Sequence, residues 1–463
     1  METAETTMFE AARAVLRRYI ALATFLGSYL ILTVVGNLLF FSPIGDQLGR
    51  HSVLGFSIRN FKTAGTAGFW ILLLLPFIVA PAVVEAVRRI AAPWLIRHGQ
   101  GLPEPSRVAY LALLLAFYLF ALTALWRADA VHLLTRATTY EDALRDRFLL
   151  LATLGFWPQM VIKSGLVTLS LFGLIQTLTK RDPFWLIIAA FNLVAVSALL
   201  ILLNMKWPLV LYYGLNVVAI LLYARRPLVP GISFAALAGT AYLLISFALL
   251  RVVPMPTIHV EIADIGAQPG HPGRGRIETS IAPPLNETSV APPLKEAAVM
   301  PLLAIFNRMA LPFPFYYDVF TGEPGKCGTL VDRIKRKTNP CQPSTLVYQE
   351  MFADQFAGIG TAPQAVHITG YALSGWAGAL IEIMLASAIM GLFAALSELR
   401  GPLVDTASII GAMAGYFFSQ LPFEGPIIYD HGILWCGIVL AFLAAAGALG
   451  TLGSGMSREP RTS

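Results

Sequence analysis

Apolar runs long enough to cross a membrane recur along this sequence, and one long polar stretch, from Val253 to about Val366, interrupts them. A helix needs about 20 consecutive apolar residues to cross the bilayer core. The sequence therefore predicts an all-α integral membrane protein with about ten transmembrane helices and one large loop. The expected spans are residues 19–41, 67–86, 108–126, 148–178, 184–204, 207–224, 232–252, 366–397, 403–420 and 431–452.

Composition supports the same class of protein. Of the 463 residues, 56% are hydrophobic and 13% are charged, whereas soluble domains carry about 25% charged residues. The net charge of +6 fits lysines and arginines that anchor helices at the cytoplasmic face. The sequence has no basic block with interleaved aromatic residues, so we expect no nucleic-acid partner.

The basic residues also predict the orientation of the chain. Arg13, Arg17 and Arg18 precede the first apolar run, which lacks a small-residue cleavage pattern and is expected to act as a signal anchor. With the N-terminus inside, fourteen basic residues lie at cytoplasmic ends and eight lie in short external loops. The large loop then lies outside the cytoplasm. The external cations are placed where they can meet an anionic ligand.

The polar loop has two parts. The first is rich in proline and glycine and contains a tandem repeat, Thr279–Glu287 and Thr288–Glu296, which favours stiff, extended backbone. A disordered insertion without function is the alternative, and we favour it. The second part contains aromatic residues and should fold as a small cap. The expected regions are residues 1–252 (seven spans), 253–300 (an external Pro-rich strap), 301–365 (an external cap) and 366–463 (three spans).

Two of the three cysteines, Cys327 and Cys341, lie in the large loop. Outside the cytoplasm they can form a disulfide, and the alternative is two unpaired thiols. We favour the disulfide because the polar stretch between them needs a covalent link. Cys436 lies in the last apolar run and is expected in the core. No histidine pair accompanies the loop cysteines, so the sequence predicts neither a metal site nor a cofactor.

Arg308 and Lys206 are cations in unusual places. Arg308 lies between two apolar runs, at the membrane surface or in a cavity, where a guanidinium needs an anion. Its planar fork suits a diphosphate, although an interfacial arginine that reaches lipid headgroups is an equal alternative. Lys206 lies in a very short external turn beside Trp207, which suits phosphate binding but also ordinary topology anchoring.

Three residues near the end of the loop are candidates for proton transfer. His367 lies where the loop becomes the eighth span, and it could act as a general base or hydrogen-bond a phosphate. A single histidine at a helix start is more often a structural residue. Asp354 and Glu350 could act as the base or pair with Arg308, and the alternative is that both are solvated surface charges.

Charged residues in or beside the spans add weaker candidates. Lys163 and Glu382 fall inside spans, where a charge marks a cavity or an ion pair. Arg127 belongs to a mixed-charge cluster with Asp129, His132 and Arg136. Their spacing is typical of one face of a helix on the membrane surface.

Several catalytic motifs are absent from the sequence. It contains no P-loop, no GxSxG, no HExxH and no paired acids of the metal-dependent sugar-nucleotide type. Asp46 in the first external loop has no acidic partner. This argues against the lipid-phosphosugar-dependent transferases that carry an aspartate there.

Three segments resemble the O-antigen polymerase and O-antigen ligase superfamily of bacterial surface-polysaccharide enzymes. They are Asn204–Leu211 followed by Tyr223–Pro227, Phe306–Arg308 followed by Phe315–Phe320, and Gly360–Pro363 continuing to Gly370–Gly378. The resemblance covers about residues 184–397, and its motifs are degenerate. The family usually has an arginine where Lys206 stands, so bidentate geometry is lost there. The proline-rich strap is not part of the family's pattern.

The resemblance implies a metal-independent, inverting glycosyltransferase that polymerises undecaprenyl-diphosphate-linked oligosaccharide repeat units at the periplasmic face. Arg308 and Lys206 would hold the donor diphosphate, and His367 would orient it or the acceptor hydroxyl. Aromatic and basic residues would add substrate contacts: Tyr316, Tyr317, Tyr371 and Arg127. The products would be O-antigen or exopolysaccharide chains of the cell envelope. Membrane lipid and a chain-length regulator protein would be the partners.

Other functions stay open. An O-antigen ligase is the weaker reading within the class, because the tyrosine pair favours the polymerase. A transporter or flippase of lipid-linked glycans predicts repeated halves with broken helices in matching places. The sequence has no such symmetry, since seven expected spans precede the loop and three follow it. A non-catalytic membrane subunit predicts that charge changes at Arg308 and His367 are tolerated.

Overall fold

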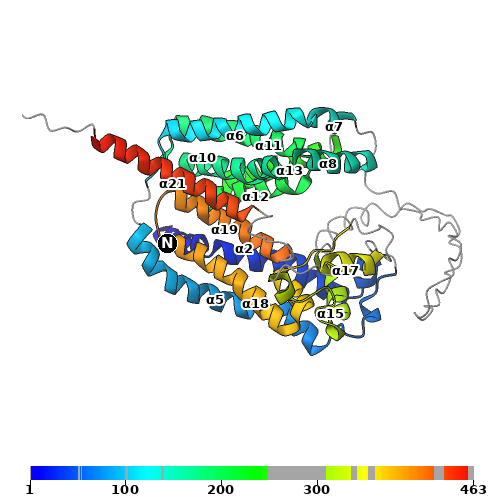
Figure 1. Cartoon of the computed structure of the whole chain (residues 1–463). Coiled ribbons are helices and arrows are strands. Elements are labelled where there is room, and N and C mark those ends of the chain that lie inside the picture. Colours follow the sequence, from blue (N-terminus) through cyan, green and yellow to red (C-terminus); the bar gives the residue numbers. More distant parts are fainter. Residues whose placement is uncertain are drawn as a thin grey trace, which may run out of the picture.

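The computed structural model in Figure 1 describes residues 2–50, 53, 55–99, 103–136, 140–248, 309–334, 341–352, 360–421 and 432–456. Every regular element in these ranges is a helix, so the fold is all-α as predicted. Eight helical segments within them are long and apolar enough to cross a membrane. The chain is a multi-pass membrane protein.

The helices are α1 (Glu2–Arg18), α2 (Ile20–Tyr29), the π-helix η1 (Leu30–Val34), α3 (Val35–Phe40), α4 (Gly45–Arg50), the 3₁₀-helix η2 (Ile58–Asn60), α5 (Ala67–Gly99), α6 (Arg107–Arg127), α7 (Ala130–Arg136), α8 (Tyr140–Leu154), α9 (Phe156–Met160), the π-helix η3 (Val161–Leu166), α10 (Val167–Lys180), α11 (Pro183–Leu202), α12 (Lys206–Tyr223), α13 (Leu228–Ala248), α15 (Pro312–Gly322), α16 (Leu330–Ile334), α17 (Pro343–Phe352), α18 (Val366–Leu396), α19 (Pro402–Gln420) and α21 (Ile433–Met456). The eight spanning segments are α2 to α3, α5, α6, α9 to α10, α11, α12, α13 and α18. Each overlaps one of the first eight expected spans, although α5 extends beyond the expected end at residue 86 and the fourth segment begins at Phe156 and not at residue 148.

The last two expected spans, residues 403–420 and 431–452, correspond to α19 and α21. Almost every residue of α19 is buried, because this helix lies between two layers of other helices. Asp405 near its start makes it less apolar than the eight spanning segments. In α21 the apolar segment is the shorter Ile433–Leu449.

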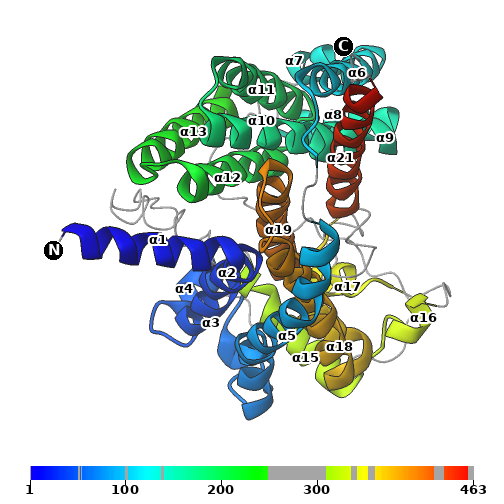
Figure 2. The same cartoon turned by 90° about the vertical axis from the view of Figure 1, so that its left-hand side faces the viewer.

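The two layers are visible in Figure 1 and, after rotation, in Figure 2. One layer holds α6 to α13, and the other holds α2 to α5 with α15 to α18. The contact between α19 and α2 is very close, because a Cβ at Gly415 would overlap the carbonyl of Ala21. At the same crossing, Ser28 Oγ and Ser419 Oγ lie 2.7 Å apart. Small residues allow this approach in a membrane, where packing drives helix association.

The fourth expected span, residues 148–178, is divided in the structure. Gly155 adopts a positive φ of 67° between α8 and α9, a conformation that glycine tolerates because it has no Cβ. After α9, the π-helical turn η3 carries Lys163. Such turns often mark functional sites within helices.

The end of the molecule that holds the N-terminus contains an ionic cluster. Arg17 donates a hydrogen bond to the buried carboxylate of Asp405, and its guanidinium lies 4.4 Å from the ring centroid of Tyr223. Arg13 donates to two carbonyls at the end of α12, where a cation is favoured by the helix dipole. These contacts join α1 to α12 and α19.

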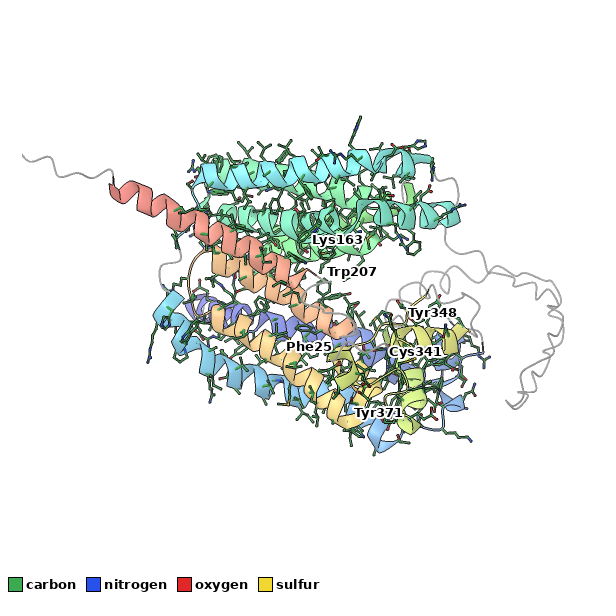
Figure 3. All side chains as sticks on the ribbon, in the orientation of Figure 1. Phe25, Lys163, Trp207, Cys341, Tyr348 and Tyr371 are labelled. Carbon is green, nitrogen blue, oxygen red and sulfur yellow. A yellow bond between two sulfur atoms is a disulfide. The ribbon has the colours of Figure 1, made fainter. Side chains whose placement is uncertain are left out.

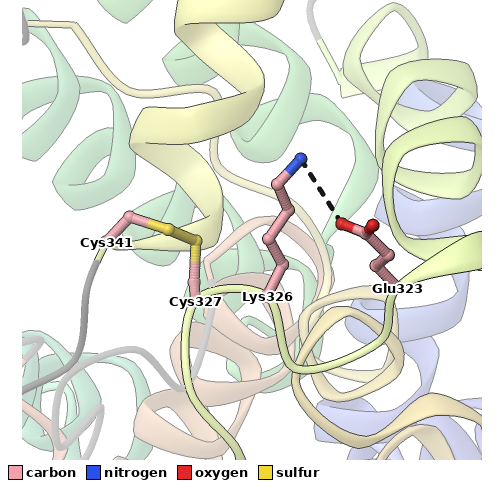
Figure 4. The surroundings of a disulfide bond; sticks show 4 residues. All are labelled: Glu323, Lys326, Cys327 and Cys341. Atoms are coloured by element: carbon pink, nitrogen blue, oxygen red, sulfur yellow. Dashed lines mark ion pairs between the residues drawn. A yellow bond between two sulfur atoms is a disulfide. The ribbon is translucent and has the colours of Figure 1, made fainter.

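The opposite end carries a cap made of α15, α16 and α17, which packs on α18 and on the segment from α3 to α5 (Figure 1). Cys327 and Cys341 form a disulfide bond within the cap (Figure 4). Beside it, Lys326 and Glu323 lie 3.7 Å apart as an ion pair. The Pro-rich strap, residues 253–300, lies outside the described residues.

Helix α18 is sharply kinked where it meets the cap. Ser374 and Gly375 leave the helical conformation, with φ and ψ of −147° and 27° and of 59° and −147°. A Cβ at Gly370 would overlap the carbonyl of Gly378, so the arm before the kink folds against the arm after it. The cap satisfies the freed backbone, since the N–H of Gly325 donates to the carbonyl of Ala372 at 2.8 Å.

Candidate functional site

A cavity of about 150 Å³ lies between η3, α10, α12 and α19. We call it the lysine cavity. Its volume is well above the roughly 10–15 Å³ that one ordered water requires. Trp207 is the second residue of α12 and Phe417 lies three residues before the end of α19, so the cavity lies toward the cap end of both helices (Figure 3). Its lining consists of Met160, Lys163, Ser164, Val167, Met205, Trp207, Pro208, Leu211, Tyr212, Met413 and Phe417.

Lys163 brings a positive charge to the lysine cavity from inside a span. It is half-buried and lies seven residues after the span begins at Phe156, which is roughly 10 Å along a helix. Its Nζ donates a hydrogen bond to Oε1 of Gln159 at 3.0 Å. No carboxylate of the described ranges lies within ion-pairing distance of Nζ. Because burying a charge beside a neutral partner is costly, the site favours an anionic ligand.

A second lysine, Lys206, lies beside the lysine cavity, and Arg147 lies near it. Lys206 is the first residue of α12 and immediately precedes Trp207, which lines the cavity. The sharp turn before α12 uses Asn204 in the left-handed conformation, with φ of 52°. Arg147 on α8 lies near enough to Lys206 for their positive charges to repel each other. Two basic residues thus lie close together at the start of α12, next to the cavity wall.

Aromatic side chains form much of the cavity wall. Trp207 stacks on Tyr416, with ring centroids 4.7 Å apart and an interplanar angle of 23°. Tyr212 adds a hydroxyl that is held 2.6 Å from Ser170 Oγ. The cavity thus combines an ammonium and a few polar atoms with an apolar wall, as small-molecule sites generally do.

The arrangement can bind an anionic group by charge and by ammonium hydrogen bonds. Nζ offers three donors and behaves as a point charge. Within the described residues no group of three or more His, Cys, Asp or Glu side chains is placed to hold a metal ion. The ammonium of Lys163 can neutralise part of the charge of a phosphate in this cavity.

Three tyrosines expected to contact substrate lie together in the core of the cap. Tyr317 stacks on Tyr371, with centroids 5.6 Å apart, and its hydroxyl lies against Gly68. Tyr316 is fully buried and donates a hydrogen bond to the carbonyl of Ala362 at 3.1 Å. In this conformation the three side chains hold the cap to α5 and α18.

His367 is fully buried at the start of α18. Its Nε2 lies 3.2 Å from the hydroxyl of Tyr29. An imidazole without solvent access cannot meet a substrate in this conformation. The geometry is that of a residue that joins α2 to α18.

The other expected site residues lie apart from one another. Glu350 is exposed on α17, and Arg127 is exposed at the end of α6. Arg308 and Asp354 lie outside the described residues, so their proposed roles stay predictions. The structure therefore groups His367 with the cap tyrosines and places Lys206 beside the lysine cavity on the other layer.

Sequence reasoning found Lys163 only as a charge within a span, and it missed the stack of Trp207 on Tyr416. The charge was a usable signal, since intramembrane lysines are rare. The stack joins residues more than 200 positions apart, and nothing local in the sequence indicates that pairing. Compared with known protein families, with curated proteins and with solved structures, the chain matches none of them.

Proposed function

We propose that this chain is a membrane glycosyltransferase that polymerises undecaprenyl-diphosphate-linked oligosaccharide repeat units. The lysine cavity carries the proposal, because Lys163 has no carboxylate partner among the described residues and lies at membrane depth toward the cap end. The diphosphate of a lipid-linked substrate is an anion that can approach Lys163 from the cap end of the span. The apolar side chains of the lining, Trp207 among them, offer contacts that a hydrocarbon chain can use.

The proposed reaction makes direct use of the cations. The oxygen of an acceptor sugar hydroxyl attacks the anomeric carbon of the donor, the bond from that carbon to the diphosphate breaks, and the hydroxyl proton passes to a base. Attack from the face opposite the diphosphate inverts the configuration. Negative charge grows on the departing diphosphate. Lys163 of the cavity lining would stabilise it, with Lys206, which adjoins Trp207 of that lining. Stabilisation that grows toward the transition state accelerates the reaction.

The disulfide supports the orientation that this function requires. Disulfides persist in oxidising compartments and are rare in the cytoplasm, so Cys327 and Cys341 favour a periplasmic cap. The basic cluster at the opposite end, with Arg13 and Arg17, fits a cytoplasmic face. The lysine cavity would then open toward the periplasmic half of the membrane.

A flippase of lipid-linked glycans is the second candidate. The kink of α18 at Ser374 and Gly375 favours it, because transporters place broken helices at their substrate sites. A lipid-phosphate site at Lys163 would serve a flippase as well as a polymerase. The two functions differ in the lipid-linked intermediate that accumulates when the protein is lost.

The test is the length of the surface polysaccharide in a host strain that lacks the gene. The strain is complemented with wild type, with Lys163→Met, or with Lys180→Met as a control at the other end of the same span. Lys180 pairs with Glu104, far from the cavity. At equal membrane levels, we expect single repeat units in the deletion and in Lys163→Met, and long chains with the control.

The other outcomes decide against parts of the proposal. Normal chain length with Lys163→Met removes the lysine cavity from the site. Lipid-linked repeat units that accumulate in the cytoplasmic leaflet of the deletion strain identify a flippase. A deletion that leaves the glycan unchanged overturns both functions.

A further inference from the structure

A second cavity, of about 280 Å³, lies in the segment between α3 and α5 at the cap end. We call it the loop cavity. Its walls include Phe40, Phe41, Asp46, Ile58, Arg59 and Phe61. The loop cavity thus presents a carboxylate and a guanidinium among aromatic rings, whereas the lysine cavity is lined by a positive charge alone.

Both charges of the loop cavity are available to a ligand. Asp46 accepts a hydrogen bond from Ser57 Oγ at 2.7 Å, which fixes its position at the wall. The backbone N–H of Arg59 donates a hydrogen bond to Oγ of Ser57 at 3.4 Å. Ser57 therefore contacts both charged residues and holds them in place. Within the described part of the chain, the two side chains do not form an ion pair with each other.

The walls of the loop cavity are supported by the cap. Phe61 meets Phe315 of α15 edge to face, with centroids 4.7 Å apart. Thr63, just beyond the cavity, donates a hydrogen bond to Asp318 at 2.7 Å. A site with its walls already in place avoids part of the ordering cost of binding.

From this lining we propose that the loop cavity is a saccharide-binding subsite. Sugar hydroxyls both donate and accept hydrogen bonds, so they can satisfy the carboxylate of Asp46 and the guanidinium of Arg59 together. The apolar C–H face of a sugar ring can pack on Phe41 or Phe61. Asp46 disfavours a purely anionic ligand and Arg59 a purely cationic one. Within the polymerisation proposed above, on which this assignment rests, the subsite holds the growing glycan.

The relative depth of the two cavities fits a lipid-linked saccharide. Ser419, two residues after Phe417 of the lysine cavity, lies against Ser28 of α2. From Ser28 the helical span continues for twelve residues to Phe40 of the loop cavity, which is about 18 Å at 1.5 Å per residue. The lysine cavity is therefore deeper in the membrane, and the loop cavity lies farther toward the cap end. A lipid diphosphate and its outward-pointing sugars have the same order.

The test measures saccharide binding to the purified full-length chain in lipid nanodiscs. The probe is the lipid-free repeat-unit oligosaccharide released by mild acid from the host's lipid-linked pool, followed by saturation-transfer NMR titration. Asp46→Asn keeps an acceptor for Ser57, and Arg59→Gln keeps the backbone contact. Arg50→Gln, an exposed residue of α4 that does not line the cavity, is the control. We expect the dissociation constant to rise about tenfold or more for each cavity variant and less than about twofold for the control.

Two results would overturn the subsite. One is wild-type affinity in both cavity variants, and the other is the absence of saturable binding to the wild-type chain. Lys163→Met should bind the lipid-free oligosaccharide as the wild type does, because this probe carries no phosphate. A negative binding titration therefore rejects the subsite without changing the result of the chain-length assay. A negative chain-length assay rejects the polymerase without changing the result of the binding titration.

Discussion

The hydroxyl of Tyr29 and Nε2 of His367 lie 3.2 Å apart, and the two rings meet edge to face with centroids separated by 5.2 Å. The same hydroxyl donates its proton to the carbonyl of Leu73 at 3.1 Å. One hydroxyl thus contacts both Leu73 of α5 and His367 of α18. Because both side chains are fully buried, this contact ties α2, α5 and the short arm of α18 together.

We expect Tyr29→Phe to destabilise the protein without removing its activity. The change leaves Nε2 of His367 without this hydrogen-bond partner in the core, which costs about 1–3 kcal/mol. The measurement is the thermal denaturation midpoint of the purified protein, with Tyr242→Phe on α13 as the control. The double variant Tyr29→Phe/His367→Leu should lose less than the sum of the single changes, because the pair is coupled. Loss of long glycan chains in His367→Leu at an unchanged midpoint would instead show a catalytic histidine.

Hydropathy predicted the spans well because a membrane helix is defined by a property that sums along the chain. The position of eight spans follows directly from runs of apolar residues. The kink in α18 does not, since Ser374 and Gly375 occur in an apolar run without proline. The kink depends on Gly370 and Gly378, which let the two arms touch, and on the cap residues that satisfy the freed backbone.

The candidate site was harder to predict, because it also depends on contacts between residues that are distant in the sequence. The sequence of an aromatic run such as Phe313 to Tyr317 is equally compatible with a binding platform and with the core of a small cap. In the structure this run packs in the core. Lys163 was visible because its charge is unusual within a span. Its surroundings were not, since Trp207 and Phe417 reach the cavity from distant helices.

The crossing of α2 and α19 should be intolerant of any side chain at Gly415. A Cβ there overlaps the carbonyl of Ala21, so Gly415→Ala must move one helix away from the other. Gly437→Ala on α21 is the matched control, because no atom lies within 4 Å of its would-be Cβ. We expect Gly415→Ala to lower the membrane level and the denaturation midpoint. The control should be neutral or stabilised by up to about 1 kcal/mol, from the higher helix propensity of alanine. Equal behaviour of the two variants would contradict the close crossing.

In the ion pair of Arg17 with Asp405, removal of the arginine alone should destabilise the protein more than removal of both charges. The side chain of Asp405 is only 6% exposed, so Arg17→Met leaves a buried carboxylate without its partner. Breaking a fully buried pair costs roughly 3–5 kcal/mol. The cost here should be lower, because Arg17 is partly solvated. Asp405→Asn added to Arg17→Met should restore much of the stability, because the stranded charge is then gone. Arg18→Met is the control, since its partner Glu398 keeps a second arginine, Arg88. The measurement is the denaturation midpoint of the wild type, of Arg17→Met, of the double variant and of Arg18→Met. A double variant no more stable than Arg17→Met would contradict the stranded-charge explanation.

A short polyprenyl diphosphate should stabilise the wild-type protein through the lysine cavity. A ligand that binds the folded state raises stability by about 2.7 kcal/mol at a concentration 100 times its dissociation constant, which is measurable as a rise in the denaturation midpoint. Lys163→Met keeps the volume of the side chain but removes the charge, so the rise should largely disappear. Lys180→Met, at the opposite end of the span and paired with Glu104 in the wild type, should respond as the wild type does. Because Lys163 is half-buried, moderate salt should weaken the effect less than it weakens a surface ion pair. An equal rise in Lys163→Met would place the diphosphate elsewhere in the protein.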